Sequence, residues 1–508
     1  MVKYDAIVVG SGNAGLTGAV SLANAGQKVL LVEQNHEPGG NATSFKRGRF
    51  TFEASLHEFM QSVGTKDQPG DLFTMFDELG VGDKIKIKHA PNESLTTILP
   101  SGKRVVMHHT KTPEELTQEL IFAFPDEASG IQQFMQKMLP YAQQFMEYMN
   151  NEVSFSNETY SADKYAPLRE NFFNRIGRIY DECNLSKDVR AVIESKIDYF
   201  SDTSTEMQPG FIVAQLLQNL EDGSYVEGGS QSITDALINK LKEEGGDLLL
   251  DNRVEKIIVE DQKVKGVVTD QNKTFEAPMV LTDMVPTETY IDLVGEENTP
   301  QSVLDQINQA SVGYSACNLF LGLDCPPEEV GIESALNFVD YTYDLDKVKR
   351  QWHTLEVPDH LLISSHCVVN PTSAPSGAAD VSIFTYQAAD QWLALNPSEY
   401  NKVKERYTND LLNKTEQFYP NIREHIEECE LATPITLMRY NSQPKGSIMG
   451  WEISDRTEVT AGPQMAKSPI KGLFITGASI GPGFYGSYKA GTVIASLMNQ
   501  ELTAGGVQ

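Results

Sequence analysis

The chain has 508 residues, of which 40% are hydrophobic and 22% are charged, so it can bury a substantial core, and this composition excludes global disorder. Its 41 Lys and Arg against 70 Asp and Glu give a net charge of −29, which argues against a nucleic-acid partner, because phosphate binding needs clustered basic residues. The length suits two interlocked domains, and no apolar run is long enough to span a membrane, so we expect neither a signal peptide nor a transmembrane segment.

The 5 cysteines are sparse, odd in number and without a C-x-x-C pair. They predict reduced, mostly buried thiols in a cytoplasmic protein. No cluster of His and Cys has metal-ligand spacing, so we expect no metal site. The negative charge disfavours attraction of the whole surface to anionic lipid, but peripheral membrane contact through a local apolar patch stays open.

A phosphate-binding motif opens the chain. Residues 6–9 form an apolar, β-type run that leads into the glycine-rich segment 10–15. Residues 16–25 are rich in Ala and Leu and predict a helix. Residues 28–32 predict a second strand, which ends at Glu33. Strand, glycines, helix, strand and acid in this order are typical of a dinucleotide-binding βαβ unit.

Each residue of this motif has a physical role. Gly10 permits a tight turn, Gly12 lets the backbone approach a pyrophosphate, and Gly15 lets the helix pack closely on the strand. The free N–H groups and the dipole at the N-terminus of the helix then stabilise the diphosphate. Glu33 stands where a carboxylate can accept hydrogen bonds from the adenosine ribose.

The segment after Glu33 indicates which dinucleotide to expect. Its paired glycines, Gly39 and Gly40, resemble the extension that FAD enzymes of the amine-oxidase and phytoene-desaturase superfamily add to the Rossmann unit. In those enzymes the backbone passes close to the diphosphate and ring system of the flavin, so the resemblance implies non-covalent FAD. The cofactor-binding residues expected from this first block are Gly10, Gly12, Asn13, Ala14, Gly15, Glu33, Gln34, Gly39, Gly40 and Asn41.

A second block lies in the middle of the chain. Gly228 and Gly229 precede a predicted helix over residues 233–244, and short predicted strands follow to residue 269. This block resembles the part of the same superfamily in which a strand reaches the adenine, and the resemblance implies that the backbone of Val254 contacts the adenine edge. An ordinary helix followed by a β-meander predicts the same secondary structure.

The third block, residues 472–487, is followed by a helix predicted from about residue 488 to 498. It resembles the strand, loop and helix with which these flavoproteins cover the ribityl chain and the pyrimidine end of the ring. Many relatives carry an acid directly after the equivalent of Gly477, whereas this chain has Ala478-Ser479. Which residue contacts the ribityl chain therefore stays open. The cofactor-binding residues that the second and third blocks add are Val254, Gly477, Ala478, Ser479 and Gly486.

The expected fold class is α/β. The three blocks predict a discontinuous Rossmann-like FAD-binding domain (GR2-type flavoprotein) made of residues 1–75, 225–290 and 430–508. Residues 76–224 and 291–429 are expected to form an inserted α+β substrate-binding domain.

One amphipathic stretch of the first insertion has two interpretations. Residues 131–149 carry Phe134, Met138, Phe145 and Met149 on one helical stripe. Such a stripe is usually core packing. Its adaptable Met and aromatic side chains also suit the wall of a tunnel for a long, flexible hydrophobic molecule.

With its three cofactor blocks in order, the chain resembles the carotenoid isomerase and retinol saturase branch of the phytoene-desaturase family. Residues 124–127, Phe-Pro-Asp-Glu, and residues 228–230, Gly-Gly-Ser, favour this branch, whereas 53–55, Glu-Ala-Ser, depart from the Asp-x-Gly of many relatives. The resemblance implies saturation or desaturation of carbon–carbon double bonds in a long isoprenoid, carotenoid or lipid-like substrate. Redox-neutral isomerisation and, as a third alternative, a non-catalytic lipid carrier stay open, as does the electron donor or acceptor.

Four residues are candidates for catalysis. His57 and Glu58 follow the strand expected to approach the flavin ring, and Tyr485 and Lys489 lie on the other flavin-facing loop. A histidine can titrate near neutral pH, so His57 is the first choice for proton transfer. Packing roles for His57 and Tyr485, and an ordinary surface charge for Lys489, are the alternatives. If isomerisation proceeds through transient charge on a polyene, it needs no protein base.

Overall fold

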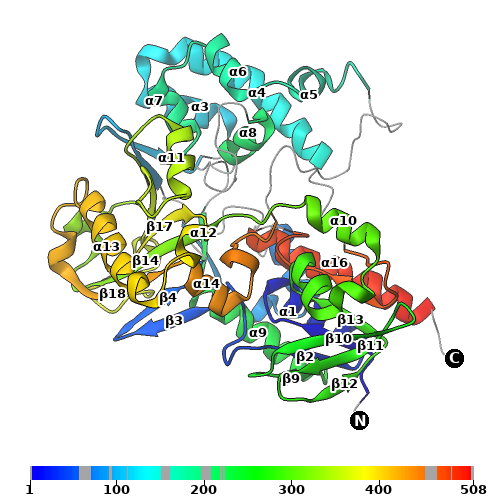
Figure 1. Cartoon of the computed structure of the whole chain (residues 1–508). Helices are drawn as coiled ribbons and strands as arrows, with labels where there is room; N and C mark the ends of the chain where they lie inside the picture. Colours follow the sequence, from blue (N-terminus) through cyan, green and yellow to red (C-terminus); the bar gives the residue numbers. More distant parts are fainter. Residues whose placement is uncertain are drawn as a thin grey trace.

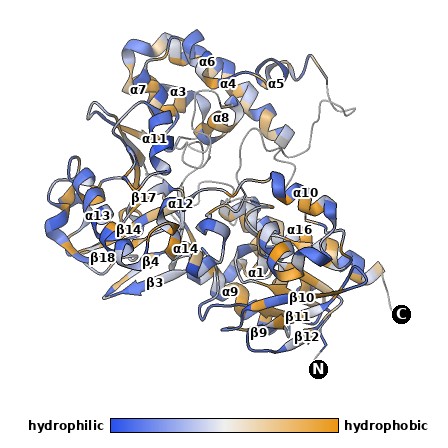
Figure 2. Ribbon diagram, in the orientation of Figure 1, coloured by the Kyte–Doolittle hydropathy of each residue, from blue (hydrophilic) through white to orange (hydrophobic). Residues whose placement is uncertain are grey.

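The computed structural model describes residues 3–55, 70–90, 94–110, 112–149, 161–195, 207–217, 220, 223–451, 466–481 and 483–504. A parallel sheet with its helices lies beside the two ends of the chain, a mixed sheet lies next to it, and a layer of helices covers the mixed sheet at the top of the view (Figure 1). Hydrophobic residues, orange in Figure 2, gather on the inner strands and on the helix faces packed against them.

The parallel sheet is the Rossmann-like core that the sequence predicts. Its five strands are, in spatial order, β19 (Leu473–Ile475), β13 (Met279–Thr282), β1 (Ala6–Val9), β2 (Val29–Val32) and β9 (Asp247–Leu249). Ala6 of β1 pairs with Val29 on one side and with Met279 on the other. These central strands are buried on both faces, which explains their continuous apolar sequences.

Helices and a small antiparallel sheet cover the two faces of the parallel sheet. The helices are α1 (Asn13–Asn24), α2 (Asp71–Glu78), α9 (Gly229–Glu243) and α16 (Gly483–Ala504), which share one hydrophobic core. The other face carries the meander of β10 (Val254–Glu260), β11 (Lys263–Thr269) and β12 (Thr274–Glu276) and the π-helical segment η5 (Glu288–Gly295). Both faces of the nucleotide-binding sheet are therefore enclosed.

Helices α1 and α16 cross in close contact. A Cβ atom on Gly491 would overlap the carbonyl oxygen of Ala14, and Thr17 Oγ1 donates a hydrogen bond to the carbonyl oxygen of Tyr488 (2.9 Å). Both helices begin earlier than the sequence predicts, at Asn13 and Gly483 instead of residues 16 and about 488. Gly486, in the first turn of α16, permits close backbone approach, because a Cβ atom there would lie 2.9 Å from the carbonyl carbon of Gly481.

The mixed sheet has seven strands. They are, in spatial order, β18 (Ile426–Ala432), β14 (Ser315–Leu323), β17 (Ala379–Gln387), β16 (His360–Ser364), β15 (Leu336–Asp340), β6 (Ser94–Ile98) and β7 (Arg104–His108). Its neighbours pair antiparallel except β15 with β6. Further helices flank it: α11 (Leu345–Trp352), α12 (Asp390–Leu393), α13 (Pro397–Thr415) and α14 (Pro434–Asn441). These strands come from both predicted insertions and, through β18, reach past residue 429. Helix α10 (Gln301–Gln309) instead packs through Val303 into the core on the meander side of the parallel sheet.

The helical layer consists of α3 (Pro113–Ala123), α4 (Ala128–Met149), α5 (Ala166–Asn171), α6 (Ile176–Glu182), α7 (Lys187–Ile193) and α8 (Pro209–Leu217). Phe134, Met138 and Phe145 of α4 are buried in the core of this layer. The stripe of α4 is therefore core packing as far as its side chains are described, and the tunnel-wall interpretation is wrong for them. A periodic apolar face shows that a helix is covered, but not what covers it.

Two β-ribbons connect the regions. One consists of β3 (Ser44–Arg47) and β4 (Phe50–Glu53), and the other of β5 (Ile87–Ala90) and β8 (Gly223–Val226). The first packs on the mixed sheet through aromatic rings, since Phe45 and Phe52 lie 4.9 and 5.7 Å from the ring of Phe320. In the described part of the chain, no helix is long and apolar enough to cross a membrane.

Candidate active site

A single cavity of about 1260 Å³ connects the carboxyl ends of β1 and β2 with the mixed sheet. Ligand pockets usually measure about 300–1000 Å³, so this cavity has room for a dinucleotide and a second molecule. Open α/β sheets bind their ligands at the carboxyl ends of the strands, which is where the cavity begins. The cavity has a glycine-rich end, called the cofactor end, and an apolar wall.

The two glycine-rich loops of the first block face one another in the cofactor end. Gly10, Gly39 and Gly40 have φ of +93°, +123° and +60°, conformations that strongly favour glycine. A Cβ atom on Gly40 would lie 3.1 Å from the Cα atom of Gly12. The loops therefore leave bare backbone at the N-terminus of α1, a cradle that fits a diphosphate.

Glu33 is fixed at the end of β2. Its Oε2 atom accepts hydrogen bonds from the backbone N–H (2.9 Å) and the hydroxyl (2.6 Å) of Ser11, and its Oε1 atom accepts one from the N–H of Asn35 (2.8 Å). Val254, at the start of β10, lines the same part of the cavity. Glu33 and Val254, the two residues expected to contact adenosine, therefore line the same cavity.

The C-terminal loop closes the other side of the cofactor end. Asn13 Nδ2 donates a hydrogen bond to Ser487 Oγ (3.2 Å), which links the N-termini of α1 and α16. Asn13 Oδ1 is buried and has no hydrogen-bond partner among the described residues. Ala478 faces the cavity, whereas Ser479 Oγ accepts a hydrogen bond from the N–H of Trp451 (3.2 Å). The open Asn13 acceptor and the glycine cradle fit a dinucleotide with hydroxyl groups.

Most of the predicted cofactor residues therefore lie together. Those that line the cavity are Gly10, Gly12, Asn13, Glu33, Gln34, Gly39, Gly40, Asn41, Val254, Ala478 and Gly486. Ala14, Gly15, Gly477 and Ser479 lie directly behind this lining. They shape the loops and do not border the cavity themselves.

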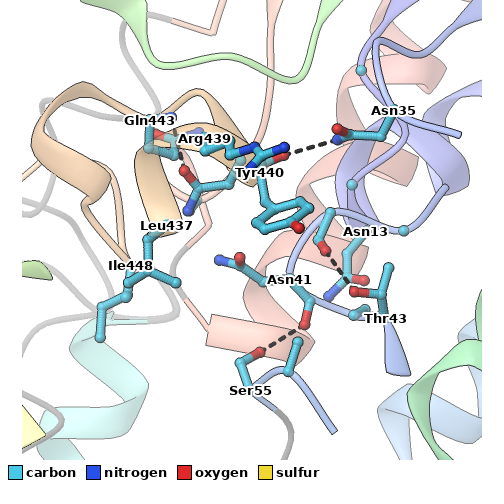
Figure 3. A pocket seen from close by; sticks show the side chains of 18 of the residues that line it. Asn13, Asn35, Asn41, Thr43, Ser55, Leu437, Arg439, Tyr440, Gln443 and Ile448 are labelled. Carbon is cyan, nitrogen blue, oxygen red and sulfur yellow. Dashed lines mark hydrogen bonds between the residues drawn. The ribbon is translucent and has the colours of Figure 1, made fainter. Parts of the chain in front are cut away.

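Sequence reasoning missed several lining residues. Helix α14 covers the mouth of the cofactor end, where Asn35 Nδ2 donates a hydrogen bond to the carbonyl oxygen of Tyr440 (2.8 Å; Figure 3). Asp283 follows β13 and also lines the cavity. The sequence did contain a signal for Asp283: a polar residue directly after a buried strand of a parallel sheet lies at the edge where ligands bind.

The catalytic candidates are only partly placed. His57 and Glu58 lie outside the described residues. Tyr485 lines the cavity and donates a hydrogen bond to Asp71 Oδ2 (3.0 Å), while Lys489 Nζ donates one to the Tyr485 hydroxyl (3.0 Å). Burial raises the pKa of Tyr485 and the bond to Tyr485 raises that of Lys489, so neither is a base at neutral pH. Lys489 is exposed and absent from the described lining.

The far wall of the cavity is apolar and aromatic. It is formed by β14, β16 and β17 of the mixed sheet, by β3 and by the segment around α14. Its apolar and aromatic lining residues are Phe45, Ala316, Phe320, Leu362, Phe384, Tyr386, Tyr400, Ala432, Ile435, Leu437, Ile448 and Met449. At one rim Arg47 Nε and Lys404 Nζ both pair with Glu430 (each 3.3 Å), so this carboxylate offsets one of the two positive charges.

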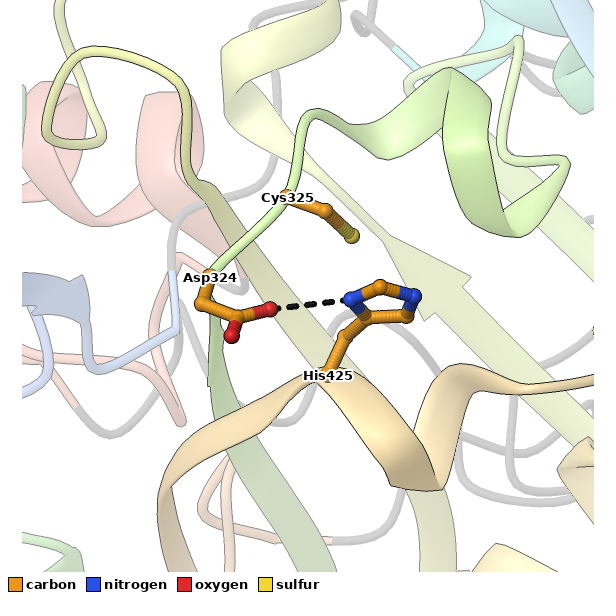
Figure 4. A group of neighbouring side chains, drawn as sticks. All are labelled: Asp324, Cys325 and His425. Atoms are coloured by element: carbon orange, nitrogen blue, oxygen red, sulfur yellow. Dashed lines mark hydrogen bonds and ion pairs between the residues drawn. The ribbon is translucent and has the colours of Figure 1, made fainter.

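The fold also gathers three groups that could ligate a metal, although their sequence spacing gave no sign of it. Asp324, Cys325 and His425 come together just after β14 (Figure 4). Asp324 Oδ1 and His425 Nδ1 are 2.9 Å apart, and burial raises the pKa of Cys325 to about 11. A hydrogen-bonded acid–histidine pair beside a protonated thiol accounts for the contacts seen.

Comparison with known proteins finds similar chains over nearly the whole length. All-trans-retinol 13,14-reductase of Danio rerio is 24% identical over 510 residues, covering 94% of this chain and 82% of that protein. Prolycopene isomerase 2 of an Oncidium hybrid cultivar is 25% identical over 512 residues, covering 95% and 81%. The crystal structure of an oxidoreductase from Methanosarcina mazei shares the fold, with a TM-score of 0.63 at 15% identity over 98% of this chain and 99% of that one.

A family model described as flavin containing amine oxidoreductase matches residues 13–497, nearly the whole chain. This match confirms the superfamily expected from the three glycine-rich blocks. The chain belongs to the flavin containing amine oxidoreductase family and is a flavin-dependent enzyme.

Proposed function

We propose that the protein binds FAD non-covalently and saturates or desaturates carbon–carbon double bonds of a long hydrophobic, isoprenoid- or lipid-like substrate. One observation carries this proposal. The cavity that begins at the glycine cradle and Glu33 continues without interruption along an apolar wall on β14, β16 and β17. A cofactor and a long apolar molecule would therefore share one continuous space.

Each end of the cavity has a task in this proposal. Bound FAD supplies hydride chemistry at its ring. The cradle of Gly12 and Gly40 holds the diphosphate, and Glu33 accepts hydrogen bonds from the ribose. The wall around Phe320 and Tyr386 buries the substrate and excludes water. Any proton transfer falls to His57, which is proposed on its sequence position alone.

The names of two relatives support this proposal. One is a retinol reductase and the other a prolycopene isomerase, each at about a quarter identity. The second relative favours an alternative, redox-neutral cis–trans or double-bond isomerisation of such a substrate on the same FAD. A non-catalytic lipid carrier is the third candidate, and the retained cradle glycines speak against it, because a carrier would not need them.

The test is anaerobic incubation of the flavin-loaded protein with a lipid extract that contains conjugated polyenes. Flavin absorbance and product mass are followed together. A mass change of two hydrogens supports saturation or desaturation, and unchanged mass with altered chromatographic retention supports isomerisation. Gly12→Val, without cofactor, is the matched control. Turnover of small amines with no change in any lipid would contradict the hydrophobic substrate.

The proposed function also suggests where in the cell the protein acts. We infer a cytoplasmic protein that makes at most peripheral contact with membranes, where apolar substrates reside. An electron donor or acceptor would then have to reach the flavin during each redox turnover. Fractionation of cells that express the tagged chain, with and without a salt wash, tests this placement.

A further inference from the structure

Asp283 occupies an unusual place among the cofactor loops. It follows the last residue of β13 directly, and its side chain lies between the loop that joins β1 to α1 and the loop after β19. Its Oδ2 atom accepts a hydrogen bond from the N–H of Gly15 (3.1 Å). A Cβ atom on Gly12 would overlap Oδ2, and a Cβ atom on Gly477 would lie 2.7 Å from Oδ1.

The carboxyl group therefore lies beside the glycine cradle. Asp283 and the cradle glycines line the same cavity, so phosphate groups bound in the cradle would lie near this carboxyl group. An ionised Asp283 would place negative charge next to negative charge in a partly desolvated site. A protonated Asp283 would instead offer its O–H as a hydrogen-bond donor to a phosphate oxygen.

The surroundings bring the ionisation of Asp283 close to neutral pH. Burial raises the pKa of its carboxyl to about 7; the N–H groups of Gly15 and Gly12 oppose this shift, and the charge of Glu33 adds to it. From the elements packed around it, α1 contributes these amides, β2 contributes Glu33, and the loop after β19 contributes Gly477. Glu33 is the titratable side chain that acts on Asp283 in the described structure.

We propose that Asp283 binds the diphosphate of FAD as a neutral carboxylic acid and takes up one proton from solvent when FAD binds to the ionised protein. This inference rests on the FAD assignment made above. The sign follows from linkage: binding disfavours the carboxylate, so the pKa rises in the complex and FAD affinity falls as the pH rises above the value of the free protein.

The first test measures the dissociation constant of FAD from the apoprotein by quenching of flavin fluorescence between about pH 6 and about pH 9. The wild-type dissociation constant should rise by up to tenfold per pH unit above about pH 7. Asp283→Asn keeps the shape and a hydrogen-bond donor but cannot ionise, so its affinity should not depend on pH. The same slope in both proteins would overturn the proposal.

A second variant identifies the source of the pH dependence. Glu33→Gln removes the negative charge that raises the pKa of Asp283, so the affinity should begin to fall at a lower pH than in wild type. The proposed ribose contact loses its charge but keeps one acceptor oxygen, so the affinity should be weaker throughout. An unchanged onset of the fall would contradict the coupling between Glu33 and Asp283.

The proton itself can be counted without any variant. Calorimetric titration of wild-type apoprotein with FAD, in buffers of different ionisation enthalpy, should show about one proton taken up above the pKa of Asp283 and none well below it. Tight binding without proton uptake would overturn the role of Asp283 while leaving the cofactor assignment intact. Absence of FAD binding at every pH would overturn both.

Discussion

The cofactor end and the apolar wall of the cavity achieve recognition with different parts of the chain. At the cofactor end, backbone atoms of Gly12 and Gly40 and a carboxylate held by three hydrogen bonds leave little freedom. The far wall consists of side chains such as Phe320 and Leu362, supported by a large mixed sheet. The cofactor end should therefore lose its ligand when atoms are added to it. The apolar wall should accept substitutions that change its shape with a moderate loss of substrate affinity.

The most severe test places a side chain in the cradle. Gly12→Val puts atoms where Asp283 Oδ2 lies and where the diphosphate must pass, so the purified protein should be colourless. Flavin absorbance and far-ultraviolet circular dichroism check cofactor and fold together. Gly26→Ala is the control: its φ is also positive, +82°, but nothing lies within 4 Å of the added atom. Full flavin content in Gly12→Val would remove the basis of the cofactor assignment.

The next largest effect concerns His57. If this residue transfers a proton to or from the substrate, His57→Gln should keep FAD and lose about 10²–10⁴ in rate, the usual contribution of a positioned acid or base. A packing role would instead lower the melting temperature and leave the turnover per folded molecule unchanged. Flavin content, melting temperature and rate are measured on the same preparation, and wild-type turnover would exclude catalysis by His57.

Two substitutions distinguish the role of the apolar wall in substrate binding from the role of the α4 stripe in stability. Ala316→Phe adds a ring to the wall and should raise KM for a long substrate by about tenfold, with unchanged flavin content. Met138→Ala empties part of the helical core and should lower stability by about 2–5 kcal/mol with KM unchanged. Steady-state kinetics and denaturant titration of both proteins check this. The opposite pattern would return the stripe to the substrate site.

Stability should also depend on pH through one buried acid in each region. Burial raises the pKa of Glu194, beside the helical layer, and of Glu288, which lines the cavity, to about 8 each. Because the folded protein holds these protons more tightly than the unfolded chain does, their stabilisation is full below about pH 4 and is lost as the pH rises towards 8. Glu194→Gln and Glu288→Gln should each raise the melting temperature at pH 8 by about 2 °C or more. Equal melting temperatures at acid and alkaline pH would contradict this.

The smallest effect is expected at Tyr485. Its hydroxyl is already held by Asp71 and Lys489, so it serves to position the start of α16. Tyr485→Phe should retain flavin and change the rate by less than about threefold, well below the range for a positioned acid or base. A hundredfold loss of rate in flavin-loaded protein would instead make Tyr485 a catalytic residue.

How much of this site the sequence predicted depends on how local each contact is. The motif from Gly10 to Glu33 was predicted because its strand, turn and helix are consecutive. The position of Asp283 after a buried strand was a local signal for the ligand-binding edge, but its partners were not predictable, because Gly12 and Gly477 lie about 270 and 190 residues away along the chain. The apolar wall was missed for another reason: β14 is buried along its whole length, so its sequence has no alternation to show which residues face a cavity.

The crossing of α1 and α16 has a consequence for biosynthesis. The cradle at Asn13 is completed by Ser487, 474 residues later in the chain, and by the strand Leu473–Ile475. Domains fold as units during synthesis, and this one cannot close until the segment that carries these residues has left the exit tunnel. The cradle of a growing chain therefore stays open while all the intervening residues are made, and closure around the cofactor follows later.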